Sequence, residues 1–388
     1  MRRPAPATLL LLLAMALGPA VWLGKTLTSP EGDAFPSVRR GPKRADLVLV
    51  TVEGLGAAEL RLHDPDQPPP PALDALAGRG LELLVAHAPG AAQPRAPLSG
   101  AASPAAPSPT GIVSLLTSRL PQDHGFNDLS TPPATPPATL LGAYAQAGFR
   151  CAAFSDVPLL HGLGLDRALE RAQELPDADP AALARAAVDW LPADEADPGL
   201  ALWVHLGPRP PGRAGAALDA LDTVLAELLD ALVATRRLER TWIVVAGSSG
   251  RGADTAVPML MRLPRHYTAG EVRIGPCSTL DLAPTLLSYF GLEPLPHAVG
   301  RSWTGDTPDA LFTGLGFAGT APLERRGPGG APVLGVRGLR ALLTDEPGAY
   351  DLTRDPAAVH NLTGTPAGDA IAQELGAALE ALERRRGG

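Results

Sequence analysis

The chain has 388 residues, a formal net charge of −8 and two cysteines. This length is enough for one large domain with a small appendage, and a core of that size does not need disulfide support. The acidic balance excludes a nucleic-acid partner, which would need a basic face. Cys151 and Cys277 lack the spacing of zinc ligands. We interpret them as small buried residues, with a disulfide as the alternative.

The N-terminus has the pattern of an export signal. Residues 1–3 are Met-Arg-Arg, and an uncharged, leucine-rich run follows over residues 4–24. We therefore expect a periplasmic, extracellular or membrane-anchored protein. Residues 1–24 are either a cleaved signal peptide or an uncleaved anchor, because the run approaches the roughly 20 residues of a membrane span. Residues 25–44 have the composition of a flexible linker.

The first predicted strand is residues 47–52, whose run of apolar, β-branched residues is typical of a strand buried on both faces of a parallel sheet. It ends at Glu53 and Gly54, at the edge where open α/β sheets bind ligands. Similar patterns predict strands at 81–88, 149–154, 200–205, 241–246 and 257–262, and helices at 71–80, 140–148, 180–191, 218–232 and 279–290.

This alternation predicts an α/β domain over residues 45–300, with a mostly parallel central sheet sandwiched by helices. From residue 301 the spacing changes to short strands and turns, with a helix predicted at 369–384. We therefore expect a small C-terminal α+β subdomain over residues 301–388.

Residues 108–125 resemble the nucleophile signature of the sulfatases. In that family the turn reads Cys or Ser, any residue, Pro, any residue, Arg, and then a Ser-Leu-Leu-Thr-Gly helix start and a later His-Gly. Here residues 108–118 read SPTGIVSLLTS and His-Gly occupies 124–125. The frame is kept, but Thr110 and Ile112 stand where the family has Pro and Arg.

Five further blocks resemble sulfatases of the alkaline phosphatase superfamily and follow the family's order. They are residues 47–54, 72–80, 203–249, 257–292 and 350–362. The resemblance implies an alkaline phosphatase-like fold and, in active members, hydrolysis of a sulfate or phosphate ester with the help of a divalent cation.

The resemblance places the metal ligands at Glu53, Gly54, Ser248 and Ser249. Active members supply two acids after the first strand, and an Asp together with an Asn or His after the late strand. A hard ion such as calcium takes about six to eight oxygen ligands, with carboxylates supplying the charge. One Glu and two hydroxyl groups do not meet that need, so we expect no metal cofactor, or calcium if the protein is active.

The resemblance places the nucleophile at Ser108, which family members convert to formylglycine. That conversion depends on the Pro and Arg that Thr110 and Ile112 replace. An unmodified Ser would need a metal or a base to activate it. The family's Lys-x-His pair corresponds to Asp156 and Pro158, so the cation and proton donor expected there are also missing.

The polar residues that remain each have two readings. Arg209, His205 and His124 are candidate substrate-binding residues, and the Arg209 guanidinium would hold a sulfate or phosphate in two-point contact. The structural alternatives are a turn fixed by His124 and a hydrogen-bonded, buried His205. In the same way Ser108 would be a helix N-cap, and Glu53 a solvated acid at a strand end.

Two hypotheses follow. The first is an exported protein that keeps the sulfatase fold, has lost ester hydrolysis and acts by binding or assembly. Its partner would be a sulfated or phosphorylated ligand or another protein, with a membrane tether if the N-terminus stays uncleaved. The second is a divergent metal-dependent sulfate or phosphate ester hydrolase that uses Ser108 and Glu53.

Overall fold

The computed structural model describes residues 45–60, 70–83, 86–88, 109–126, 132–176, 178–193, 199–209, 215–249, 256–264, 271–273, 277–303, 321–326, 332–338, 340–346, 348–355 and 358–387. All of these belong to one compact unit, Arg39–Gly388. The expected signal or anchor (1–24), the linker (25–44) and Ser108 lie outside the described residues. No helix in these ranges is both long and apolar enough to cross a membrane.

An eight-stranded sheet forms the centre of this unit, in the order β10-β2-β9-β7-β1-β6-β4-β5. The strands are β1 (Asp46–Glu53), β2 (Leu81–Leu83), β4 (Arg150–Ser155), β5 (Arg171–Glu174), β6 (Leu200–Leu206), β7 (Thr241–Ser249), β9 (Met259–Arg262) and β10 (Glu271–Arg273). Only β9 runs antiparallel to its neighbours, β7 and β2. The predicted mostly parallel sheet is confirmed.

Strand β1 lies at the middle of the sheet and is buried along its whole length. It pairs in parallel with β6 on one side and β7 on the other. Thr51 is opposite His205 of β6. The register with β7 shifts after Val52, so that Glu53 is opposite Ser249.

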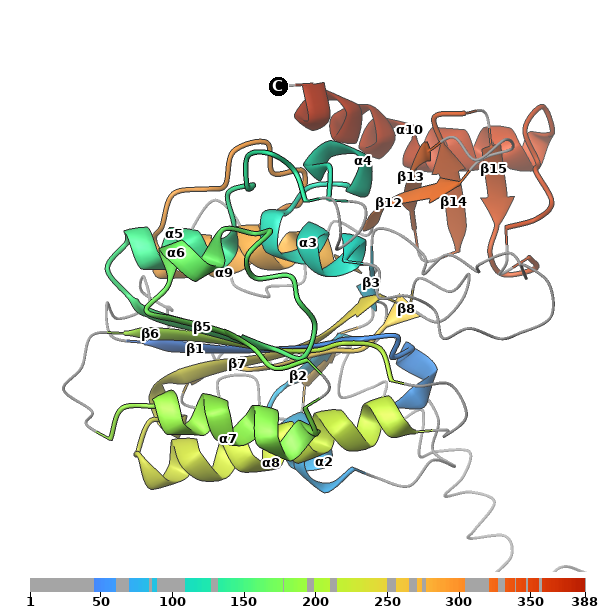
Figure 1. Cartoon of the computed structure of the whole chain (residues 1–388). Coiled ribbons are helices and arrows are strands. Elements are labelled where there is room, and N and C mark those ends of the chain that lie inside the picture. The colour runs from blue at the N-terminus through green and yellow to red at the C-terminus, as the bar shows by residue number, and fades with distance from the viewer. Residues whose placement is uncertain are drawn as a thin grey trace, which may run out of the picture. The chain divides into compact units, whose positions relative to one another are not determined.

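Helices cover both faces of the sheet (Figure 1). One face carries α2 (Pro71–Ala77), α7 (Pro180–Trp190) and α8 (Ala216–Ala234). The other carries α3 (Thr110–Thr117), α5 (Leu140–Gln146), α6 (Leu165–Ala168) and α9 (Leu282–Phe290). Because strand side chains alternate between faces, Val48, Val50 and Val52 pack against the leucines of α8. Thr51 therefore faces the α3 side.

The C-terminal region contains a separate four-stranded antiparallel sheet and one long helix. The elements are β12 (Ala321–Arg326), β13 (Pro332–Arg337), β14 (Ala341–Thr344), β15 (Gly348–Asp351) and α10 (Pro366–Gly387). Ile371, Leu375 and Leu379 of α10 form a core with apolar residues of β13 and β14. Near its end, Arg386 of α10 pairs with Asp123 of the short helix α4 (Pro121–His124).

Three short strands form a third sheet, β11-β3-β8, at Cys277–Ser278, Ala86–His87 and Ala256–Val257. The strands predicted at 81–88 and 257–262 are therefore each divided between two sheets. In the second case the break falls at Pro258, which has no N–H to continue a ladder. The helix predicted at 279–290 begins as a 3₁₀ turn, Thr279–Asp281, before α9.

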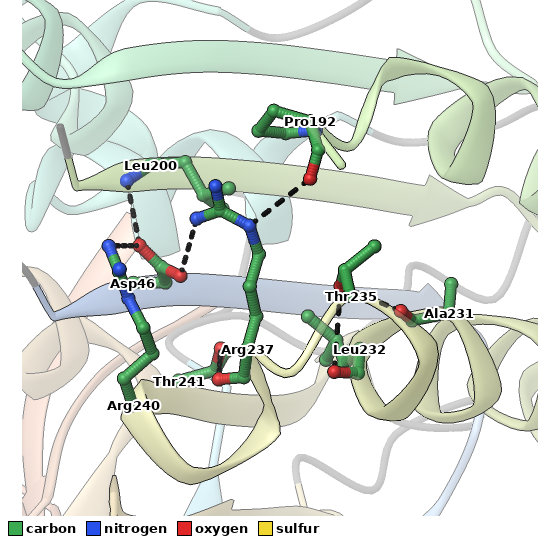
Figure 2. Close-up of polar contacts among 9 residues, drawn as sticks. All are labelled: Asp46, Pro192, Leu200, Ala231, Leu232, Thr235, Arg237, Arg240 and Thr241. Atoms are coloured by element: carbon green, nitrogen blue, oxygen red, sulfur yellow. Dashed lines mark hydrogen bonds and ion pairs between the residues drawn. The ribbon is translucent and has the colours of Figure 1, made fainter. Parts of the chain in front are cut away.

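The starts of the central strands are tied together by a buried ion cluster (Figure 2). Asp46 of β1 and Arg237 are both fully buried, and their Oδ2 and Nη1 atoms are 3.0 Å apart. Arg240 donates to Oδ1 of Asp46 at 3.0 Å, and the Leu200 N–H donates to the same oxygen at 3.1 Å. One carboxylate thus joins β1, β6 and the turn before β7.

Candidate ligand site at the carboxyl edge of the sheet

Strands β1, β4, β6 and β7 are parallel, so their C-terminal ends meet at one edge, here called the carboxyl edge. Open α/β sheets bind their ligands at such an edge. The candidate residues of β1, β6 and β7 lie at this edge: Glu53, His205, Ser248 and Ser249. Asp156 follows β4 and Arg209 follows β6 at the same edge. Ser108 is the one candidate that cannot be placed, because it lies outside the described residues.

The ends of β1 and β7 are hydrogen-bonded to each other through serine side chains. The Gly54 N–H donates to Ser249 Oγ at 3.1 Å, and Ser248 Oγ donates to the Val52 carbonyl at 3.3 Å. Gly54 has a φ of 72°, a left-handed conformation that favours glycine. Glu53 is only 6% exposed. The alternative reading of Glu53 as a solvated acid is therefore wrong, because this strand end is buried and pairs with Ser249 of β7.

Helix α3 rests directly on the end of β7. A Cβ atom placed on Gly111 would lie 1.9 Å from the backbone oxygen of Ser248. The helix begins at Thr110, and Pro109 holds its N-cap position without a side-chain hydrogen bond. Ser108 is therefore not the N-cap residue that one interpretation of the sequence expected.

The residues at the four expected ligand positions do not fit a calcium site. One carboxylate, Glu53, is present, while both serine hydroxyls are engaged with the backbone and Gly54 offers no side chain. Six to eight oxygens with several carboxylates would be needed. Across the ranges that the structure describes, no group of three or more His, Cys, Asp or Glu side chains is placed to hold a metal ion.

His124 is the last residue of α4, and its ring is hydrogen-bonded in the turn that follows α3. Its Nδ1 accepts the Phe126 N–H at 3.1 Å, so the proton of the neutral ring is on Nε2. Nε2 lies 3.1 Å from Ser114 Oγ and 3.3 Å from the Thr110 carbonyl. Burial lowers the pKa of His124 to about 4. The ring is therefore neutral at neutral pH, and these contacts fix the turn.

We expect His124 to titrate near pH 4 with its neutral proton on Nε2. Because the folded pKa lies below that of an unfolded histidine, about 6.5, its contribution to stability is complete above pH 6.5 and is lost as the pH falls towards 4. Nitrogen-15 NMR of the histidine rings measures both the tautomer and the titration. A midpoint near 6.5 would contradict this assignment.

His205 is fully buried on the α3 side of the sheet, where one of its ring nitrogens is engaged. Nδ1 lies 2.8 Å from Thr51 Oγ1, which also accepts the Trp203 Nε1–H at 2.9 Å. Burial lowers the pKa of His205 to about 4, although the nearby Asp156 charge opposes the shift. Nε2 is buried and has no hydrogen-bond partner. The structural reading of the sequence, a fully hydrogen-bonded imidazole, is therefore only half right.

Arg209 pairs with Asp156. The guanidinium Nη2 donates to Oδ2 of the carboxylate, and the Gly207 N–H donates to Oδ1 at 2.6 Å. The side chain of Asp156 is 6% exposed and that of Arg209 19%. The sequence reading considered each residue separately and missed this pair. The signal was available, since opposite charges follow two strands that were both predicted to end at this edge.

The two cysteines are buried thiols, so the alternative of a disulfide between them is wrong. Burial raises the pKa of the Cys151 thiol to about 12, and it raises the pKa of Cys277 as well. Reactive cysteines need the opposite shift. Neither residue is therefore suited to nucleophilic chemistry.

Comparisons with known proteins give structural matches. No protein-family model matches the sequence, and no curated protein matches it either. A phosphonate monoester hydrolase of Agrobacterium radiobacter matches with a TM-score of 0.67 and 16% identity, over 88% of this chain and 96% of that one.

Two further structures match over a similar extent. BT4656, solved in complex with its substrate D-glucosamine-2-N,6-O-disulfate, has a TM-score of 0.68 and 14% identity over 89% of this chain and 98% of that one. BT1596, a 2-O glycosaminoglycan sulfatase, has a TM-score of 0.61 and 14% identity over 89% and 93%. The chain therefore has the fold of these sulfatase and phosphonate monoester hydrolase structures.

Proposed function

We propose that this chain is an exported protein that keeps the sulfatase fold, has lost ester hydrolysis and acts by binding or assembly. The observation that carries the proposal is the closed junction of β1 and β7. Ser248 and Ser249, two of the expected metal ligands, are engaged in hydrogen bonds with the backbone of β1 and its end, and α3 packs on the Ser248 carbonyl. A divalent cation that activates a nucleophile needs several carboxylate ligands, and Glu53 is the one carboxylate among the four expected ligand positions.

The state of the other polar groups supports the same proposal. His124 is committed to the turn after α3, and Arg209 to Asp156. The histidines at this edge are kept neutral by burial, so neither His124 nor His205 offers a positive charge to a sulfate at neutral pH. Export is supported by the charged and then apolar N-terminus.

The metal content of the purified protein tests the proposal first. The full chain is equilibrated separately with calcium, magnesium, manganese and zinc, desalted and analysed for bound metal. We expect much less than one ion per chain for each metal. About one ion per chain that is lost in the Glu53→Gln variant would show that a metal site has been rebuilt, and the proposal would then be wrong.

Turnover provides the second test. Aryl sulfate, phosphate monoester and phosphonate monoester substrates are each incubated with the chain and with its Ser108→Ala variant. We expect the same background rate for both proteins with every substrate. Hydrolysis that disappears in Ser108→Ala would instead support the divergent hydrolase.

A further inference from the structure

The carboxylate of Asp156 is bound in the way that a protein binds an anionic ligand. One oxygen receives a backbone N–H, from Gly207 at 2.6 Å, and the other receives the guanidinium of Arg209. Backbone N–H groups and guanidinium groups are the usual donors to sulfate and phosphate oxygens. Asp156 comes from the turn after β4, whereas both donors follow β6. The donors and the anion thus come from different segments.

Two features support the interpretation that the donors form a site in their own right. Gly207 allows close approach, since a Cβ atom there would lie only 3.1 Å from Oδ1 of Asp156. The side chain of Asp156 is only 6% exposed, so its carboxylate depends on these donors rather than on water.

We propose that Asp156 is an internal anion that occupies an oxyanion site formed by Arg209 and the Gly207 N–H. As long as its carboxylate is in place, a sulfate or phosphate group is excluded both by volume and by like charge. When the negative charge is removed, the same donors become available to an external tetrahedral anion.

This inference goes beyond the loss of hydrolysis. A protein without hydrolytic activity could still bind sulfate or phosphate esters at an open site. A site filled by its own carboxylate would not, and that favours a protein partner over a sulfated ligand for the native chain.

Anion binding by Asp156 variants tests the inference. Inorganic sulfate and inorganic phosphate are titrated by calorimetry into the full chain, into Asp156→Ala and into Asp156→Asn, at constant ionic strength. We expect binding to Asp156→Ala that is at least about 10-fold tighter than to the native chain, a difference of about 1.4 kcal/mol. Asp156→Asn keeps the shape of the side chain and an acceptor for Gly207, so it should gain less.

The double variants Asp156→Ala/Arg209→Met and Asp156→Asn/Arg209→Met are the matched controls, and we expect both to lose the gained affinity. Formate, which mimics the deleted carboxylate, should compete with sulfate in Asp156→Ala. Equal affinity in the native chain and in a folded variant would overturn the inference, as would a gain that survives Arg209→Met. If Asp156→Ala does not fold, the Asn pair of variants decides. Metal content and turnover are not involved, so the inference and the proposed function can fail separately.

Discussion

Replacing Asp46 by Asn is expected to lower the free energy of unfolding by about 3 to 5 kcal/mol. The change keeps the size of the side chain and its acceptor for the Leu200 N–H. It removes the negative charge that lies 3.0 Å from the fully buried guanidinium of Arg237. The guanidinium also donates to the Pro192 carbonyl, but a neutral acceptor does not compensate a buried positive charge as a carboxylate does. The large expected effect follows from that uncompensated charge.

Urea denaturation of the two proteins measures this difference. Glu380→Gln is the matched control, because it removes a carboxylate from an exposed i,i+4 pair with Arg384 in which both side chains are about 70% exposed. We expect that control to change stability by at most about 0.5 kcal/mol. The double variant Asp46→Leu/Arg237→Met should be more stable than Asp46→Asn, since it removes the fully buried guanidinium of Arg237 together with its carboxylate. A loss below about 1 kcal/mol for Asp46→Asn would mean that the cluster is solvated.

The central elements of the fold could be predicted because their local patterns are unambiguous. Strands β1, β6 and β7 are buried on both faces and therefore appear as uninterrupted apolar runs. Strand β5 was missed because it lies at the edge of the sheet, has no fully buried residue and reads Arg-Ala-Gln-Glu. A polar edge strand has no hydrophobic period to detect. Its position is determined by pairing with β4.

The candidate site could be predicted less well, because its state depends on contacts between distant segments. The sequence indicated correctly that Glu53 follows a buried strand, but its burial depends on the packing of helix and strand around it. It also indicated Asp156 as a position where the family has Lys, and Arg209 as a candidate substrate-binding residue. Their pairing depends on β4 and β6 being neighbours in the sheet, which no local pattern specifies. Local patterns thus identify the strand ends, and the strand order decides which side chains meet there.

Replacing Gly111 by Ala is expected to destabilise the chain by about 3 kcal/mol, which is unusual for a helix position. Alanine favours helices over glycine by roughly 0.5 to 1 kcal/mol. Here the added Cβ would lie 1.9 Å from the backbone oxygen of Ser248, and neither partner is a flexible side chain that can turn away. Helix α3 would have to move off the end of β7. The steric penalty therefore exceeds the gain in helix propensity.

Gly376 in helix α10 provides the matched control, because a Cβ atom added there meets nothing within 4 Å. We expect Gly376→Ala to stabilise the chain by about 0.5 to 1 kcal/mol, so that the same substitution has opposite signs in the two helices. Thermal and urea denaturation of both variants measure the difference. If Gly111→Ala were neutral or stabilising, α3 would not rest on β7, and the closed junction on which the proposed loss of hydrolysis depends would have to be abandoned.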